Sequence, residues 1–216
     1  VQKLGIKPEI DNGKIHEAHA LGAFDGVNPL QMAAAYSAFS NGGYYNEPYS
    51  VNKIIITNTG EEYTHESEKT KAMEDSTAYM ITSILDDTSI TGGGAMENVA
   101  MKTGTTNFDE NYRKKLGMAD DAIRDSWVVG YTTKTTIAMW YGYKDTNAES
   151  VAQGYYFHNL AGTVQRDRLF TAIANEVFED NKEEFTMPDS VVRVPLVSGS
   201  STARVAGTGY SGSTIY

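Results

Sequence analysis

Lysine, threonine and glycine are gathered in one short segment, Met101–Asn107, whose sequence is MKTGTTN. In a β-strand, successive side chains alternate between the two faces. Lys102 and Gly104 would then share one face. Thr103 and Thr105 would share the other. Such a strand offers a cation, hydroxyl donors and, at the glycine, a backbone that a ligand can approach closely, which suits an anionic ligand.

Other residues that could do chemistry carry less specific patterns. His16 and His19 are three residues apart but lie in a loop-like context, so neither a metal site nor a cofactor is predicted. The acidic pairs Asp120–Asp121 and Glu183–Glu184 are expected to lie in solvated turns rather than to act as acid and base. The candidate chemistry therefore rests on the lysine-threonine-glycine segment.

Composition limits the class of protein. The chain has 216 residues, is 40% hydrophobic, and carries 18 Lys and Arg against 28 Asp and Glu, a net charge of −10. It is long enough to bury a core and is expected to be one domain or a large part of one. Nucleic-acid binding is not expected, because the net charge is negative and no dense basic cluster occurs. The sequence has no cysteine, and no apolar run approaches the roughly 18 residues of a membrane span.

Periodicity and turn residues predict the elements that must position the segment. An asparagine cap at Asn28 followed by Pro29 predicts the start of an alanine-rich helix. Trp127 and Trp140 are expected to pack against the sheet rather than to bind substrate. The predicted helices cover residues 29–39, about 73–85 and about 157–178, and the predicted strands cover 49–56, about 61–63, 99–106, 125–131 and 136–143.

This order predicts an α+β fold, with helices flanking an antiparallel sheet in which 99–106 is an inner or near-edge strand. Residues 91–94 read as a glycine-rich loop, and 107–118 as a loop at the rim of the site. Residues 1–187 form the predicted domain, and 188–216 a Ser/Gly-rich, loosely held extension. The opening VQKLGI reads as a helix end stopped by Gly5, so a preceding segment is expected.

The order of several segments resembles the transpeptidase domain of class A, bifunctional penicillin-binding proteins of Gram-positive bacteria. The similarity runs from about Gly22 to Phe178. It comprises NPLQMAAAYSAFSNGG, a hairpin, a helix, a glycine-rich loop, AMKTGTTN and DSWVVGYTTKTTIAMWYGY. K-T-G is a motif of penicillin-binding proteins and related β-lactamases. The resemblance implies the fold of those proteins.

The resemblance also implies roles for the segment. Lys102 would supply positive potential and organise nearby hydroxyls. Thr103 and Thr105 would bind the terminal carboxylate of a D-Ala-D-Ala stem peptide or of a β-lactam. The backbone N–H of Thr105 would donate to the oxyanion, and Gly104 would leave room for the acyl group. The implied reaction is peptidoglycan cross-linking through a serine acyl-enzyme.

The nucleophilic serine of such an enzyme is expected upstream of this chain. The only S-x-x-K match is Ser50–Lys53. Its alternating pattern predicts a strand, which would turn Ser50 and Lys53 to opposite sides, so it is rejected. This chain alone is therefore expected to be inactive and to work with the N-terminal part of its own protein. A glycosyltransferase segment and a membrane anchor in that part would place it on the extracytoplasmic face of the cell membrane.

Two alternatives remain open at this stage. One is a serine β-lactamase or D,D-carboxypeptidase of the same fold. The other is a non-enzymatic domain that senses β-lactams or binds peptidoglycan without turnover.

Overall fold

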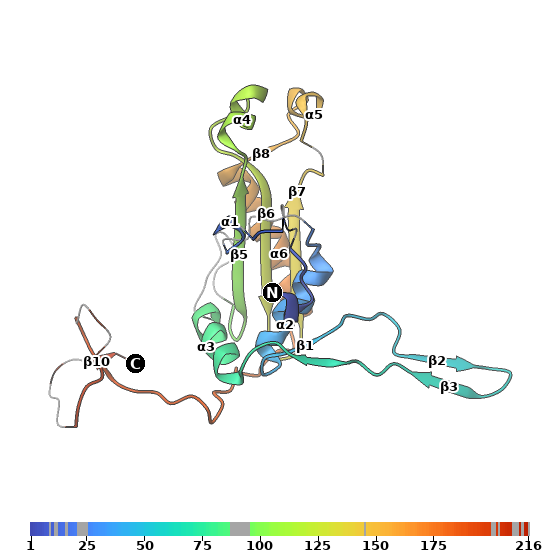
Figure 1. The fold of residues 1–216 in the computed structure, drawn as a ribbon, viewed down its shortest axis with the longest axis vertical. Coiled ribbons are helices and arrows are strands. Elements are labelled where there is room, and N and C mark those ends of the chain that lie inside the picture. The colour runs from blue at the N-terminus through green and yellow to red at the C-terminus, as the bar shows by residue number, and fades with distance from the viewer. Residues whose placement is uncertain are drawn as a thin grey trace. The chain divides into compact units, whose positions relative to one another are not determined.

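The computed structural model describes residues 1–8, 10, 13–15, 17–20, 26–86, 96–144, 146–199, 202, 204–208, 212 and 214–215. The chain divides into two compact units, Val1–Thr186 and Met187–Tyr216. The elements follow in this order (Figure 1): η1 (Gln2–Leu4), α1 (Glu17–Ala20), α2 (Pro29–Ser40), β1 (Tyr44–Asn46), β2 (Lys53–Ile56), β3 (Glu61–Thr64), β4 (Lys69–Lys71), α3 (Asp75–Asp86), β5 (Ala100–Asn107), α4 (Glu110–Leu116), β6 (Ala122–Tyr131), β7 (Thr136–Gly142), α5 (Ala148–Ala152), β8 (Phe157–His158), α6 (Asn159–Val177), β9 (Leu196–Val197) and β10 (Thr214–Ile215).

The central sheet is antiparallel, with the order β5-β6-β7 and with β8 paired to β6. Gly104 of β5 lies opposite Trp127 of β6, which in turn lies opposite Trp140 of β7. In the tight turn between β6 and β7, the Thr132 hydroxyl oxygen accepts a hydrogen bond from the N–H of Thr135 at 3.0 Å. The predicted antiparallel hairpin is confirmed, and β5 is the terminal strand of the described sheet.

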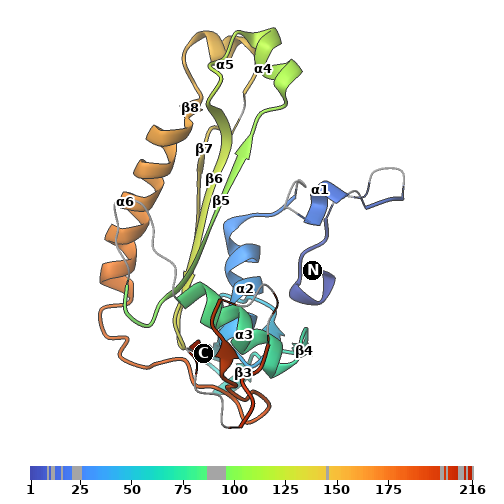
Figure 2. The same cartoon turned by 90° about the vertical axis from the view of Figure 1, so that its left-hand side faces the viewer.

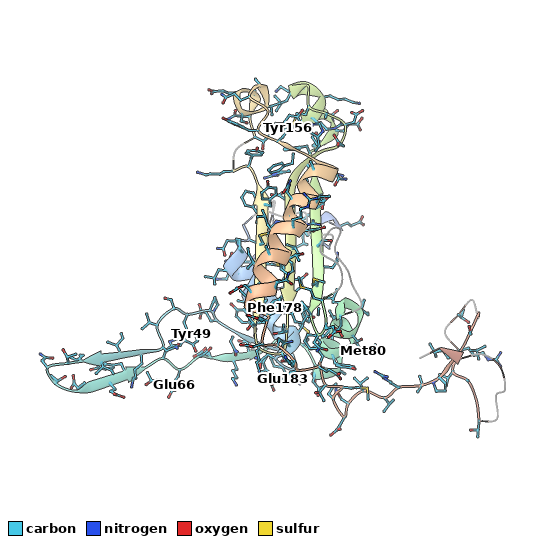
Figure 3. The ribbon with its side chains drawn as sticks, turned by 180° about the vertical axis from the view of Figure 1, so that it is seen from behind. Tyr49, Glu66, Met80, Tyr156, Phe178 and Glu183 are labelled. Carbon is cyan, nitrogen blue, oxygen red and sulfur yellow. The ribbon has the colours of Figure 1, made fainter. Side chains whose placement is uncertain are left out.

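Helices cover both faces of this sheet (Figure 2). On one face, α6 packs against β6 and β7; its Phe170 is fully buried among Met101, Val128 and Phe178. Figure 3 shows Phe178 at the C-terminal end of α6. On the other face, α2 and α3 enclose a second cluster around Tyr131. The predicted α+β fold is confirmed.

Helix α2 forms as its sequence predicts. The side-chain oxygen of Asn28 accepts from the Gln31 N–H at 2.9 Å, and the Gln31 side chain accepts from the Asn28 N–H at 3.1 Å, which closes a capping box. The buried residues of the helix are Ala34, Ala35 and Ala38. These small side chains let the helix approach the sheet closely.

The strand predicted at 49–56 is shorter than expected. Strand β2 includes only Lys53–Ile56, which pairs in register with β3. Every residue of this hairpin is exposed, so strand structure extends only as far as cross-strand pairing supports it. Figure 3 shows Tyr49 and Glu66 where the hairpin joins the rest of the unit. The pairing of β1 with β4 was not predicted.

Three short helices were also missed: α1, α4 and α5. Helix α1 carries His19, so the loop expected there is wrong. Residues 107–118 were predicted to be a loop, but they contain α4. The signals were local: Asp109 caps the helix by accepting from the Tyr112 N–H at 3.0 Å, and Gly117 ends it in the left-handed conformation at φ 66°. Helix α5 likewise begins with a capping box at Asn147.

The predicted glycine stop near the start is confirmed. Gly5 follows the 3-10 helix η1 with φ 72°. The predicted glycine-rich loop at 91–94 and His16 lie outside the described residues. In the second unit, β9 and β10 form a short antiparallel pair.

Candidate active-site strand

Strand β5 begins in the core and ends at the surface. Ala100 and Met101 are fully buried and anchor the strand in the clusters on opposite faces of the sheet. From Lys102 onward, the residues are exposed or half-buried. The register with β6 is regular up to Thr106 and shifts between Thr106 and Asn107. The chemically interesting side chains therefore sit on a rigid strand just where it leaves the core.

The predicted alternation of side chains is consistent with the contacts. Met101 belongs to the cluster on the α6 face, and Thr105, four residues later, contacts a residue of α6. Ala100 belongs to the cluster on the α2 face, so Lys102 and Gly104 share that face. All four predicted site residues lie on one strand, divided between its two faces.

Lys102 is exposed, and its ammonium group lies against its own strand. Its Nζ donates to the carbonyl oxygen of Thr103 at 2.7 Å. The charge is thus held near the backbone of the following residues. An anionic ligand at this edge would meet a cation close at hand.

Packing does not require a glycine at position 104. A Cβ added there would lie 3.6 Å from the Cβ of Trp127, an ordinary van der Waals distance. Gly104 is also exposed. Its missing side chain leaves the surface of β5 open, as the approach of a ligand to the backbone requires.

Trp140, which lies opposite Trp127 on the next strand, packs on the sheet. Trp140 is half-buried, and its Nε1–H donates to Asp125 Oδ1 at 2.8 Å. A Cβ added at Gly142 would lie 2.6 Å from Cζ2 of Trp140, so the indole covers that glycine. These contacts agree with a packing role for Trp140.

A buried ion pair lies behind β5 and was not predicted. Arg166 Nη2 and Asp167 Oδ1 are 2.6 Å apart, with side chains 4% and 1% exposed. Arg166 Nη1 lies 3.5 Å from Thr105 Oγ1 and 3.3 Å from Ser126 Oγ. The helical spacing of apolar residues in 157–178 indicates which face of that helix is buried. It does not indicate that Arg166 contacts Thr105, which lies 61 residues earlier in the sequence.

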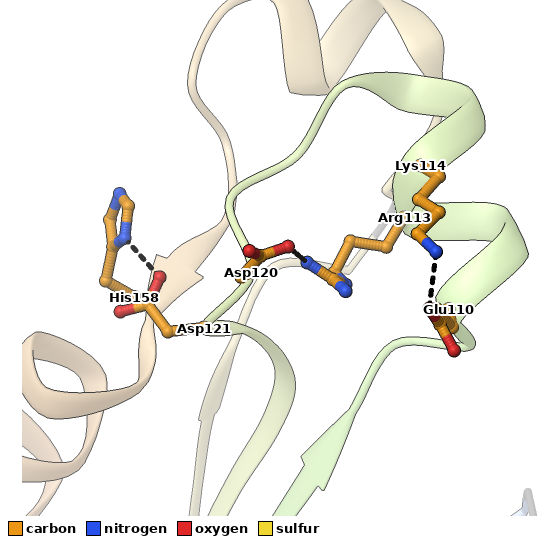
Figure 4. A network of polar contacts seen from close by, with 6 residues as sticks. All are labelled: Glu110, Arg113, Lys114, Asp120, Asp121 and His158. Carbon is orange, nitrogen blue, oxygen red and sulfur yellow. Dashed lines mark hydrogen bonds and ion pairs between the residues drawn. The ribbon is translucent and has the colours of Figure 1, made fainter.

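The acidic pair at 120–121 joins the ends of neighbouring elements (Figure 4). Asp120 forms an ion pair with Arg113 of α4, and this guanidinium holds the pKa of Asp120 below its usual value. Asp121 Oδ1 lies 2.7 Å from His158 Nδ1. The other pair in the figure, Lys114 and Glu110, lies 2.5 Å apart on α4.

The acidic pair at 183–184 is exposed, as expected, but it lies in an irregular segment rather than in a turn. Glu183 lies 2.6 Å from Lys134 Nζ and accepts from the Thr133 hydroxyl at 2.9 Å. Bonding to Lys134 holds its pKa below the usual value. Neither acidic pair is arranged as a catalytic acid and base.

Ser50 and Lys53 do not form a nucleophile and base. Ser50 precedes β2 rather than lying on it, so the predicted strand is wrong there. The residues are nevertheless not on a helix, where three-residue spacing would bring them together. Lys53 instead pairs with Glu62 across the hairpin at 3.0 Å. In the described part of the chain, no group of three His, Cys, Asp or Glu side chains is placed to hold a metal ion.

The fold and the position of the lysine-threonine-glycine strand define a transpeptidase-type domain. Residues 4–162 match the family model of the penicillin-binding protein transpeptidase domain, and the chain belongs to this family. It is 40% identical over 212 residues to penicillin-binding protein 1A/1B of Bacillus subtilis, covering 94% of this chain and 22% of that protein. It is 35% identical over 176 residues to penicillin-binding protein 1A of Streptococcus oralis, covering 74% of this chain and 26% of that protein.

The resemblance to class A penicillin-binding proteins is therefore confirmed, and the chain spans about a quarter of the length of these relatives. A crystal structure of penicillin-binding protein 1A from Haemophilus influenzae has the same fold. The TM-score is 0.60 at 17% identity, covering 96% of this chain and 36% of that one. Within the described residues, no helix has the length and apolarity needed to cross a membrane.

Proposed function

We propose that this chain supplies the substrate-binding strand of a peptidoglycan D,D-transpeptidase whose nucleophilic serine lies upstream. The observation that carries the proposal is β5: an edge strand bearing Lys102-Thr103-Gly104 where it leaves the core, in a chain of the penicillin-binding protein transpeptidase family.

The proposed reaction proceeds through an acyl-enzyme. The upstream serine attacks the carbonyl of the penultimate D-alanine, and the terminal D-alanine leaves as the peptide bond breaks. The amine of a neighbouring stem peptide then attacks the ester, which forms the cross-link and frees the serine. A β-lactam acylates the same serine when its ring opens.

Each residue of β5 has a distinct role in this proposal. The ammonium of Lys102 supplies positive potential and helps organise the reacting hydroxyls. The backbone N–H of Thr105 donates to the developing oxyanion; losing one such donor typically costs on the order of 100-fold or more in rate. The hydroxyls of Thr103 and Thr105 bind the terminal carboxylate. Gly104 leaves space for the acyl group.

The whole protein is proposed to act on the extracytoplasmic face of the cell membrane, held by an N-terminal anchor and carrying a glycosyltransferase upstream. Its ligands are D-Ala-D-Ala stem peptides and β-lactams. The names of its relatives as penicillin-binding proteins support this proposal.

A product assay of the parent protein tests the reaction type. The protein is incubated with a peptide ending in D-Ala-D-Ala and with an acceptor amine, and the products are separated by mass. We expect a cross-linked product and released D-alanine, both abolished by prior treatment with penicillin. Hydrolysed peptide without cross-link would identify a carboxypeptidase, and rapid turnover of penicillin would identify a β-lactamase. Binding without either product would identify a sensor.

A further inference from the structure

Arg166 is a buried guanidinium to which the reaction described above assigns no task. It lies on α6 with a side chain 4% exposed, and its Nε and Nη2 reach the same oxygen of Asp167, at 2.7 and 2.6 Å. Burying a charge is unfavourable unless it is paired and hydrogen-bonded. Asp167 meets that need on one side of the guanidinium.

The other side of the guanidinium faces the sheet. Nη1 lies 3.3 Å from Ser126 Oγ and 3.5 Å from Thr105 Oγ1. Thr105 and Ser126 are direct cross-strand partners, so one cation contacts a pair of neighbouring hydroxyls. Of the two, Ser126 is fully buried whereas Thr105 is exposed on the terminal strand.

These contacts fix the direction of the Thr105 hydroxyl bond. A guanidinium has only donors and stays protonated at any pH a protein tolerates. Thr105 Oγ1 must therefore accept from Arg166, which leaves the hydroxyl hydrogen free to point away from α6. A carboxylate in place of Arg166 would draw that hydrogen inward. The arginine thus presents Thr105 to the surface as a donor, which is the polarity that an anion requires.

We propose that Arg166 is a positioning residue that holds the Thr105 hydroxyl as a donor to the substrate's terminal carboxylate. The inference rests on the proposed function of β5. Because Asp167 neutralises the guanidinium, the effect is local orientation rather than long-range attraction of the ligand. The contribution of Arg166 to carboxylate binding is expected to depend little on salt concentration, since buried charges are weakly screened.

The test measures how fast the parent protein is acylated by benzylpenicillin and by its methyl ester, which lacks the carboxylate anion. The double variant Arg166→Met/Asp167→Leu removes both buried charges, because removing one alone would strand the other. We expect its acylation by the acid to fall about tenfold relative to wild type, with the ester changed less than about twofold. Arg168→Met, an exposed change on the same helix, should alter neither rate.

A second variant covers the case in which the double change prevents folding. Arg166→Lys keeps the charge beside Asp167 but loses the planar fork, and it should show the same carboxylate-selective loss, several-fold in size. An equal loss for acid and ester would mean that the ion pair supports only the fold, and would overturn the proposal, as would unchanged rates. Wild-type protein that is not acylated upstream would instead refute the proposed function, and this proposal with it.

Discussion

Gly104 is the residue at which one added carbon would most change the chemistry of β5. A Cβ there meets only ordinary contact with Trp127, so packing tolerates it. On the proposed function, the same Cβ would occupy space that the acyl group needs.

We predict that Gly104→Ala changes the free energy of unfolding by less than about 0.5 kcal/mol. It should lower the rate of β-lactam acylation in the parent protein at least tenfold. Thermal unfolding and acylation kinetics of the same preparation provide the two readouts. Thr106→Ser, a mild change on the same strand, serves as the control. An exposed glycine such as Gly60 would not serve, because its φ of 76° is unfavourable for alanine. A large loss of stability in Gly104→Ala would show that position 104 is constrained by packing.

Ionisation of Tyr131 should affect the stability of the fold, because this residue lies in the cluster on the α2 face of the sheet. Its ring is fully buried, and its hydroxyl lies 3.0 Å from Thr82 Oγ1. Burial raises the pKa of Tyr131 from 10.0 to about 12, although the hydrogen bond to Thr82 partly opposes this. Since the folded pKa exceeds the unfolded one, the folded state holds the proton more tightly.

The stability contributed by Tyr131 should be fully present below pH about 10 and lost as the pH rises through about 12. The loss is on the order of 2 kcal/mol. Denaturant unfolding at a series of alkaline pH values measures it, and Tyr131→Phe should remove this component of the pH dependence. Tyr63→Phe, on the exposed hairpin, serves as the control. An unchanged slope in Tyr131→Phe would show that another group titrates.

Among individual residues, the sequence predicted Lys102 and Gly104 as site residues but made no prediction for Arg166. Adjacent residues on one strand alternate by geometry alone, so their faces were predictable. The contact between Arg166 and Thr105 depends on how α6 packs across the sheet, and no local pattern specifies that packing.

Among the elements, helix α2 does not carry a predicted site residue, but it packs on the strands that hold β5 in place. Its capping box at Asn28 starts a helix that packs on β6 and β7, which in turn hold β5. Helix α2 was predicted correctly because its asparagine cap, the proline at its first position and the glycines that follow Asn41 all agreed. Strands β1 and β4 were missed because each has three residues and is defined only by its partner.

We predict that Asn28→Ala destabilises the unit by about 1 kcal/mol, because the N–H of Gln31 loses its acceptor. Asn28→Ser should recover most of that loss, since serine also caps. Denaturant unfolding of the three proteins measures the differences. Equal stability of the alanine and serine variants would argue against the cap as the cause.

At the largest scale, the chain divides after Thr186, and Met187–Tyr216 form a second compact unit. The segment just before the division belongs with the sheet. Phe185 lies 5.7 Å, between ring centroids, from Tyr131, and Glu183 pairs with Lys134.

We propose that removing 187–216 from the parent protein changes its free energy of unfolding by less than about 0.5 kcal/mol and leaves acylation intact. Removing 179–216 should cost about 2 kcal/mol, because Phe185 and its apolar contact are lost. Thermal unfolding of the two truncations separates the cases. Equal stabilities would mean that the segment before Thr186 contributes nothing.

The position of the nucleophile is the central claim at this scale, and intact mass spectrometry after incubation with penicillin tests it most directly. We predict no adduct on the 216-residue chain. A longer parent protein should carry one adduct, and peptide mapping should place it on a serine upstream of Val1. An adduct on Ser50, or on any other residue of this chain, would contradict the account.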